Sequence, residues 1–349
     1  MIDLLSKIRS HLNLQLPFAV FCKPGATAVT GLFQREPGVH YIENYNDPGF
    51  VFAPFFGDRR VFIPLEIADV ITAVFDADPS VHPASQPEID QHAKISFEAL
   101  VAKSVAEIRA GKFEKLVCSR TEKVQTDTDI TTIYQRLLAA YPNAYRYCFY
   151  TPDTGSWMGA TPEQLVRLDG AELHTVALAG TQPYIDGVII WEDKEKQEQQ
   201  FVTDYILKEL NGTIADVSTN GPYTFRAGNL VHIKTDISAA IDPASDLKKI
   251  IDTLHPTPAI CGLPKHEAMQ FLLENEGYDR EYYSGFLGQI NGVDNDGQKE
   301  TDLFVNLRSM KVEGNTAQLF IGCGITKDSD PEKEFIETVN KSMTMRRVL

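Results

Sequence analysis

The chain has 349 residues, of which 43% are hydrophobic and 23% charged, enough for one large domain or two ordinary ones with a sizeable core. The formal net charge of −15 disfavours nucleic acid as a partner, because nucleic-acid binders usually carry a basic surface. An anionic small molecule would need local help against this charge, from a metal ion or a few placed arginine and lysine side chains.

The cysteines and the first residues of the chain predict a cytoplasmic location. The five cysteines are odd in number and form no C-x-x-C pair, which fits reduced thiols better than a disulfide framework. Residues 1–21 lack the basic start, apolar run and cleavage site of a signal peptide, and no run of 18 apolar residues occurs. We therefore expect a cytoplasmic protein with no membrane partner.

The first part of the chain predicts strands, and helices and strands follow in mixed order. In residues 1–90, short apolar runs such as FAVFC and FVFAPFF are broken by proline, glycine and aspartate, which is typical of strands and turns. A polar connection at 83–92 leads to a helix whose apolar spacing runs from Phe97 to Ile108, and Gly111 is a natural end for it. A β-rich segment at 115–124 and a helix at 130–141 come next.

The rest of the chain predicts a mixture of helices and antiparallel strands. Strand and turn patterns occupy 145–182, 223–238, 282–291, 302–312 and 317–325, and helical patterns occupy 191–210, 246–255, 264–277 and 329–343. Asp330 suits the N-cap of the last helix and Pro331 suits its first turn. We expect one α+β domain over 1–349 with large sheets covered by helices, in which 1–92 is a strand-rich N-terminal part and 93–349 is catalytic.

Common motifs for phosphate loops, dinucleotides, zinc proteases and serine hydrolases do not occur, so single polar residues carry the chemical signal. Lys115 opens a strand, where a lysine is usually an exposed edge residue, although in a pocket it could act as a base. Glu163 follows Thr161 and Pro162, an order that fits the first turn of a helix. Glu198 lies within a charged helix, where solvation is the usual state.

The closing helix gathers Glu334, Glu337 and Lys341 on one face. Such a stripe is usually a solvated face with Glu337–Lys341 pairing, and the alternative is that the carboxylates hold a hard cation while the lysine helps to hold an anion. Arg308 is a lone charge in a segment predicted to be a strand. Glycine-containing segments at 177–181 and 322–325 would let a ligand approach the backbone closely.

Taken together and in this order, the segments resemble the chorismate-utilising enzymes, a family that includes anthranilate, aminodeoxychorismate, salicylate and isochorismate synthases. The matching segments are KLVCSR, GATPEQL, ALAGT, KEKQEQQFV, VHIKTDI, LHPTPAICGLP, DREYYSGFLG, LRSM, IGCGIT and DSDPEKEFIETVNKSMTM. They cover residues 95–349, while the first 90 residues match loosely. The resemblance implies large antiparallel sheets packed face to face and flanked by helices.

The resemblance also implies a magnesium site and a set of substrate-binding residues. Glu198 and Glu337 would be direct ligands of Mg²⁺, with Glu334 close by and acting through water, which suits an ion that prefers octahedral oxygen coordination and keeps waters. Arg308 and Lys341 would meet the carboxylates of dianionic chorismate. The remaining substrate contacts implied in this way are Ala179, Gly180, Thr181, His232, Thr235, Ala259 and Gly322.

Within the family the residues are most similar to those of isochorismate synthases. Members that add water to ring carbon 2 carry a lysine base where Lys115 stands, whereas anthranilate synthases typically carry glutamine there. Glu163 would be the acid that protonates the departing 4-hydroxyl, and Ala179 stands where aminodeoxychorismate synthases carry a nucleophilic lysine. Gln199 replaces a histidine that is frequent in the family, which puts any proton transfer there in doubt.

The alternatives are a salicylate synthase, which eliminates pyruvate from the same intermediate, then an anthranilate synthase component, and from another class a non-catalytic chorismate-binding subunit. The presence of both Lys115 and Glu163 disfavours the last of these. We expect a monomer with no glutaminase subunit. The pathway is either menaquinone or catecholate siderophore synthesis, and we favour menaquinone.

Overall fold

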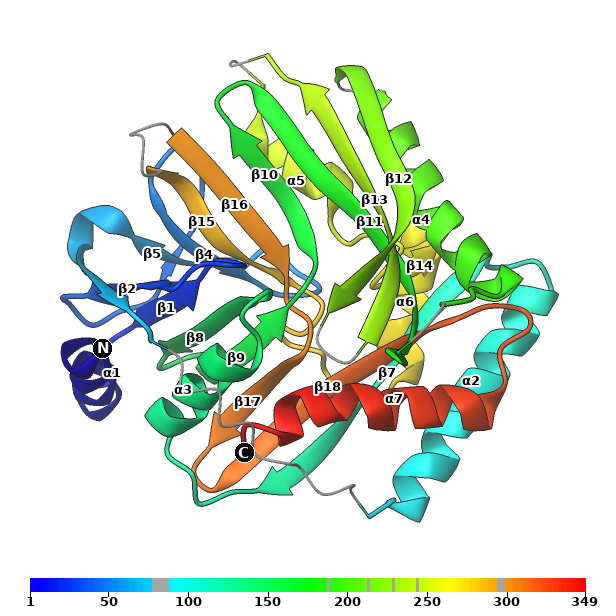
Figure 1. Ribbon diagram of the computed structural model, residues 1–349, viewed down its shortest axis with the longest axis horizontal. Coiled ribbons are helices and arrows are strands. Elements are labelled where there is room, and N and C mark those ends of the chain that lie inside the picture. The colour runs from blue at the N-terminus through cyan, green and yellow to red at the C-terminus, as the bar shows by residue number, and fades with distance from the viewer. Residues whose placement is uncertain (77–87, 187–188, 212–213, 228–229, 243–244, 294–298) are drawn as a thin grey trace.

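The computed structural model describes residues 1–76, 88–186, 189–211, 214–227, 230–242, 245–293 and 299–349, which form two large sheets surrounded by helices (Figure 1). The helices of these residues are α1 (Ile2–Leu14), α2 (Gln91–Arg109), α3 (Ile130–Ala140), α4 (Asp193–Asn211), α5 (Leu247–Leu254), α6 (Lys265–Asn275) and α7 (Pro331–Arg346), with a short 3-10 helix η1 at Leu65–Ile67. Parts of two predicted segments, 83–87 and 228–229, lie outside the described residues.

In the described residues each sheet has nine strands, and every strand pairing is antiparallel. The first sheet has the order β14 (Gly262–Leu263), β7 (Lys115–Gln125), β18 (Thr316–Ile325), β17 (Ser309–Glu313), β9 (Gly155–Thr161), β8 (Tyr145–Thr151), β1 (Phe18–Cys22), β2 (Ala28–Gln34), β6 (Ala68–Val74). The second has the order β12 (Ala215–Ala227), β13 (Leu230–Ala240), β11 (Glu172–Pro183), β10 (Gln164–Asp169), β16 (Lys299–Val305), β15 (Phe286–Val293), β4 (Gly49–Ala53), β5 (Val61–Pro64), β3 (His40–Tyr41).

Two short connections between the sheets lie side by side. Strand β9 of the first sheet leads through Glu163 into β10 of the second, and β16 of the second leads through Arg308 into β17 of the first. The backbone N–H of Ala160 donates to the carbonyl of Arg308 at 3.0 Å, and the N–H of Val305 donates to the carbonyl of Glu163 at 2.9 Å. The fold therefore brings Glu163 and Arg308 to one seam between the two sheets.

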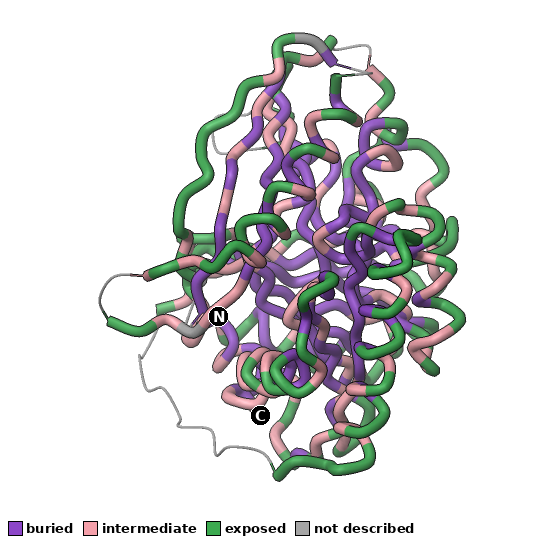
Figure 2. The backbone as a smooth tube through the Cα atoms, turned by 90° about the vertical axis from the view of Figure 1, so that its right-hand side faces the viewer, coloured by how far each residue is buried: buried purple, intermediate pink, exposed green. Residues whose placement is uncertain are grey.

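Aromatic side chains fill much of the space between the sheets. Phe52 of β4 stacks on Phe149 of β8 with ring centroids 4.3 Å apart, and Tyr145 of β8 stacks on Phe304 of β16 at 4.2 Å. Trp157 of β9 belongs to the same cluster and is fully buried. Large rings bury much apolar area, which stabilises the face-to-face packing. In Figure 2 the buried backbone accordingly lies in the middle of the molecule and the exposed segments lie around it.

The helices cover the outer faces of the sheets (Figure 1). Helix α4 packs on β11, β12 and β13, while α2 and α7 pack on each other and on β7 and β18. Helix α7 begins as the sequence predicts, with Pro331 as its first residue and the Asp330 side chain accepting from the N–H of Lys333 at 3.0 Å. Lys194 of α4 forms an ion pair with Glu334 of α7, so these two helices meet beside the seam.

Three local predictions are wrong. Residues 2–14 form a helix, α1, where strands and turns were expected. Glu163 lies between two strands and not at the start of a helix, because Thr161 ends β9 and Gln164 begins β10. Arg308 lies outside any strand, with a φ of 48° that breaks the extended backbone between β16 and β17.

Other sequence features agree with the structure. All five cysteines are free and buried, as expected for reduced thiols. The strand predicted at 317–325 is present as β18, and the helices predicted at 191–210 and 264–277 are present as α4 and α6. Among the described residues, no helix has the length and apolar character that crossing a bilayer requires.

Candidate active site

A cavity opens at the seam between the two sheets and encloses about 650 Å³, part of it open to solvent. Its walls come from both sheets, from α4 and α7, and from the loop between α5 and α6. The proposed site residues that line it are Glu163, Ala179, Gly180, Thr181, Glu198, His232, Ala259, Arg308, Gly322 and Lys341. Segments that are far apart in the sequence therefore meet at one concave site, as the resemblance implied.

Glu163 is a buried acid in this cavity. Its side chain is only 4% exposed, and it sits at the connection between β9 and β10. Burial raises the pKa of Glu163 to about 8, although the positive charges of Lys115, Lys341 and Arg308 act in the opposite direction. A carboxyl group with this pKa is mostly protonated at neutral pH, so it can donate a proton.

Lys115 lies directly behind the cavity wall and not in the wall itself. It is fully buried, and its Nζ forms an ion pair with Oε1 of Glu198 at 2.9 Å. Burial would raise the pKa of Glu198, but Lys115 and the other nearby lysines hold it below its ordinary value. Gly324 makes room for this pair, because a Cβ atom there would collide with the Glu198 carboxylate. Lys115 is therefore not an exposed edge residue, which is the usual state of a lysine at the start of a strand, but a buried residue beside the cavity.

The carboxylates of α7 are also paired with lysines. Glu337 pairs with Lys341 at 2.7 Å, and the buried Glu334 pairs with Lys194. Burial raises the pKa of Glu334, and the neighbouring charge of Glu337 raises it further. Glu337 and Lys341 line a neighbouring cavity that shares Thr181 and Lys341 with the first. The face predicted on the last helix is thus turned toward the site and not toward bulk solvent.

These carboxylates are chemically suited to a divalent cation. The Oε2 atom of Glu334 is buried without a hydrogen-bond partner. Lys194 forms an ion pair with Glu334. Burial would lower the pKa of Lys194, but the charges of Glu334, Glu337 and Glu198 raise it. Carboxylate oxygens are the ligands that Mg²⁺ prefers. In the described part of the chain, however, no three acidic, histidine or cysteine side chains are close enough to hold a metal as they stand. The carboxylate oxygens fit a divalent cation chemically, but Glu198 and Glu337 would have to turn away from Lys115 and Lys341 before they could bind one.

Two positive side chains also line the cavity. Arg308 and Lys341 both line the cavity; Arg308 donates to the hydroxyl of Thr344 at 3.2 Å and Lys341 donates to the carbonyl of Gly322 at 3.0 Å. Burial would lower the pKa of Lys341, but Glu337 raises it above the ordinary value. Burial lowers the pKa of Arg308, but a guanidinium group stays protonated in proteins. Both side chains can therefore bind carboxylates.

His232 offers a neutral acceptor to the cavity. Its Nδ1 lies 3.1 Å from the carbonyl of Gly180 and 3.1 Å from the hydroxyl of Thr181, while its Nε2 is buried without a partner. Burial lowers the pKa of His232 to about 3, and Arg308 and Lys341 lower it further. Because a carbonyl can only accept, an Nδ1–H that donates to Gly180 leaves the Nε2 lone pair free for a ligand hydroxyl.

Thr235 and Gln199 have a supporting place behind the cavity. The Gln199 amide donates to the hydroxyl of Thr235 at 2.8 Å and to that of Thr203 at 2.8 Å, and all three side chains are buried. Thr235 does not line the cavity in the described residues, so its substrate contact stays a prediction. Gln199 fills its position with hydrogen bonds that tie α4 to β13.

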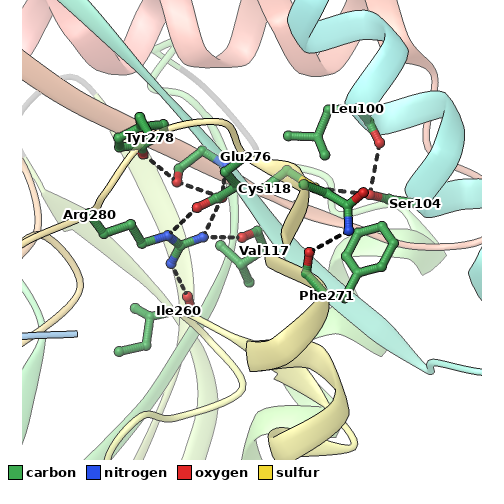
Figure 3. A network of polar contacts seen from close by, with 11 residues as sticks. Leu100, Ser104, Val117, Cys118, Ile260, Phe271, Glu276, Tyr278 and Arg280 are labelled. Atoms are coloured by element: carbon green, nitrogen blue, oxygen red, sulfur yellow. Dashed lines mark hydrogen bonds and ion pairs between the residues drawn. The ribbon is translucent and has the colours of Figure 1, made fainter. Parts of the chain in front are cut away.

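A buried ion pair that the sequence analysis missed holds one wall in place (Figure 3). Arg280 and Glu276 are each 2% exposed in their side chains and pair at 2.6 Å. The same guanidinium donates to the carbonyls of Val117 at 2.6 Å and Ile260 at 2.9 Å, and both of these residues line the cavity. Arg280 lies in a segment that carried the resemblance, but nothing in its immediate sequence distinguishes it from a surface arginine.

Replacing Arg280 with methionine is expected to destabilise the fold by about 3–5 kcal/mol, because Glu276 would be left as a buried charge without an oppositely charged partner. Urea unfolding measures the loss. The double variant Arg280→Met/Glu276→Gln should recover part of it. As a control, Lys248→Met breaks an exposed i,i+4 pair and should cost less than about 1 kcal/mol. Equal losses for the two single variants would contradict a structural role for the buried pair.

Known proteins resemble this chain in sequence and in fold. Residues 66–349 match the protein family described as "Chorismate binding enzyme". The chain is 29% identical over 277 residues to the "Salicylate biosynthesis isochorismate synthase" of Pseudomonas aeruginosa, covering 76% of this chain and 57% of that one. It is 27% identical over 282 residues to "Isochorismate synthase MenF" of Escherichia coli, covering 78% and 64%. The chain thus spans less than two thirds of these relatives.

The architecture also has a close counterpart among solved structures. A crystal structure described as a putative 2,3-dihydroxybenzoate-specific isochorismate synthase, DhbC from Bacillus anthracis, superposes with a TM-score of 0.81. The match covers 99% of both chains at 22% sequence identity. This likeness confirms the predicted α+β fold with two face-to-face antiparallel sheets.

Proposed function

This chain belongs to the chorismate binding enzyme family, and from that premise we propose that it is a Mg²⁺-dependent isochorismate synthase. The proposed reaction adds water at ring carbon 2 of chorismate and releases the 4-hydroxyl group. One C–O bond forms, one breaks, and the ring double bonds shift between them. The reaction therefore needs a base for the attacking water and an acid for the departing hydroxyl.

The observation that carries the proposal is Glu163. It is a carboxyl group with its pKa raised to about 8 in a cavity that also contains Arg308 and Lys341. Two cations suit the two carboxylates of chorismate, and a protonated acid beside them suits the departure of hydroxide. A carboxyl group that served only to bind a cation would not need to be neutral.

Lys115 is the proposed base that accepts a proton from the attacking water, and its contact with Glu198 sets a condition for this step. Its nitrogen faces Glu198 at 2.9 Å and not the open cavity. Glu198 has to engage another partner before the Lys115 lone pair can accept a proton from water. The donor set of Glu198 and Glu337, with Glu334 acting through water, would hold Mg²⁺, which when bound would neutralise the ring carboxylate of the substrate.

Other reactions of the family have less support. Ala179 offers no amine where a covalent amination would need one, and the cavity wall beside it is the bulged backbone at Gly180. Salicylate synthase remains the second candidate, because elimination of pyruvate from isochorismate would use the same cavity. We favour menaquinone over siderophore synthesis; one structural neighbour is described as a menaquinone-specific isochorismate synthase and another as a 2,3-dihydroxybenzoate-specific one. We also propose that the protein acts as a monomer without a glutaminase subunit.

Product analysis tests the proposal. The protein is incubated with chorismate and Mg²⁺ in the absence of ammonia, and the products are separated by chromatography. Isochorismate as the main product supports the proposal. Salicylate and pyruvate in equal amounts would establish the second candidate instead, and unchanged chorismate in the presence of tight binding would point to a non-catalytic subunit.

A further inference from the structure

A second cavity adjoins the catalytic one and shares Pro162 and Arg308 with it. It encloses about 1540 Å³, part of it open to solvent, between the end of α3, the β12–β13 edge and the C-terminal half of α7. Its volume exceeds the 650 Å³ of the catalytic cavity, measured in the same way. We call it the arginine cavity, because Arg226, Arg308 and Arg347 line it.

The charge of the arginine cavity is opposite to that of the whole protein. Arg226, Arg308 and Arg347 are all cationic, and no aspartate or glutamate lines the cavity among the residues that the structure describes. The chain as a whole carries a net charge of −15. A dianion approaching the protein is repelled by most of its surface, so a concentrated positive opening directs it to one place.

Contacts around the arginine cavity hold its cations near the catalytic site. The guanidinium of Arg226 lies 3.6 Å from the centre of the Tyr184 ring. Tyr141, Arg308 and Arg347 line the cavity together. Burial raises the pKa of Tyr141 to about 12, while the charges of Arg347 and Arg308 act in the opposite direction. The Tyr141 hydroxyl donates to the carbonyl of Thr344 at 2.8 Å, and Arg308 donates to the hydroxyl of the same residue. Arg308 thus belongs to both cavities.

The other cavity beside the catalytic one has a different charge. It is lined by Glu332 and Glu337 together with Lys333 and Lys341, so its acidic and basic side chains balance. It lies on the side where the carboxylates of α7 would hold a cation. The two openings therefore separate by charge, and the arginine cavity is the one suited to anions.

We propose that the arginine cavity is the vestibule through which the dicarboxylate substrate reaches the catalytic cavity, with Arg226 and Arg347 capturing its carboxylates before Arg308 binds one of them. The inference rests on the proposed function, because it takes a dianionic ring acid as the substrate. Capture of this kind acts on the rate of association, and it weakens as salt screens the charges.

The test compares Arg226→Gln/Arg347→Gln with the wild type over a range of ionic strength. At low salt the double variant is expected to have a kcat/KM about tenfold lower, with a smaller change in kcat, and a flatter dependence on salt. The difference should vanish near 1 M salt, where the screening length is about 3 Å. Arg109→Gln is the matched control: Arg109 contacts Lys327, just before the start of α7, and that 16-residue helix separates it by about 24 Å from Arg347.

Wild-type kcat/KM in the double variant at low salt would overturn the vestibule, and so would a loss of equal size at every salt concentration. Calorimetry with isophthalate, an unreactive benzene dicarboxylate, separates this inference from the proposed function. If the wild type binds isophthalate more tightly than the double variant at low salt but does not convert chorismate, the vestibule stands and the proposed function fails. If chorismate is converted and the control and double variants behave alike, the vestibule fails and the proposed function stands.

Discussion

Lys115→Gln and Glu163→Gln are each expected to lower the turnover of chorismate by about 10²- to 10⁴-fold while chorismate still binds. Water is a poor nucleophile and hydroxide a poor leaving group, so each end of the reaction needs a proton transfer. Glutamine keeps nearly the volume of glutamate but cannot donate a proton of comparable acidity. Turnover measured together with chorismate affinity by calorimetry checks the pair.

Glu163 also predicts a dependence on pH with a definite sign. The pKa of Glu163 is about 8 in the folded protein, whereas an ordinary glutamate, as in the unfolded chain, has a pKa of 4.5. Between pH 4.5 and 8 the folded state therefore binds one more proton than the unfolded state. The stability of the wild type should therefore fall as pH rises from about 4.5 to 8, and Glu163→Gln should lack this fall. The kcat/KM of the wild type should likewise decline above about pH 8, where Glu163 loses the proton that it donates.

Asp302 provides a control for burial alone. It is 4% exposed, burial raises its pKa to about 6, and it does not line the catalytic cavity. Asp302→Asn should change the pH dependence of stability and leave turnover near that of the wild type.

Near-normal conversion of chorismate by Lys115→Gln or Glu163→Gln would show that the assigned acid–base pair is wrong. Ammonia should partly rescue Lys115→Gln by forming an aminated product, because ammonia needs less activation than water.

Removal of divalent cations with excess EDTA is expected to abolish turnover, and Glu198→Gln and Glu337→Ala are expected to do the same in the presence of Mg²⁺. Both carboxylates come from separate helices that meet at the cavity, and Mg²⁺ would need both. Calorimetric titration of the substrate-free protein with Mg²⁺ supplies a reading that does not depend on turnover.

The matched control for the metal site is Glu332→Ala on the same helix as Glu337. Its side chain is 70% exposed and pairs with Lys94 on the surface, so its loss should leave Mg²⁺ binding and turnover near those of the wild type. Thermal unfolding of Glu198→Gln shows whether Lys115 tolerates the loss of its charged partner. Full turnover in excess EDTA would remove the metal from the mechanism.

The sequence predicted many elements correctly where the signal is local and periodic. The N-cap at Asp330 and the strand that opens at Lys115 are examples, because capping chemistry and apolar runs are visible within a few residues. Glu163 was misassigned for a related reason. The order Thr161–Pro162–Glu163 satisfies local helix rules, but pairing with distant strands decides the backbone there.

The geometry of the site could not be predicted from local sequence patterns. Whether Lys115 is exposed or buried depends on Glu198 and Gly324, which are 83 and 209 positions away in the chain. Arg280 and Glu276 are only four positions apart, but the burial of their pair depends on contacts with Val117 and Ile260, and the place of Arg347 in a cavity also depends on several elements. The resemblance supplied residues that do meet at one cavity, and the contacts that support them became visible only in three dimensions.

The interleaving of early and late strands has a consequence for the order in which this protein folds. Phe50 of β4 pairs with Gln289 of β15, and Val20 of β1 pairs with Cys148 of β8, so strands made first wait for partners made much later. During synthesis the ribosome has to deliver most of the chain before the second sheet can form. Contacts this distant close slowly and leave apolar strand edges unpaired in the meantime. The nascent N-terminal strands therefore stay without their final partners through much of synthesis, and a chaperone that covers exposed strand edges would act on them in that interval.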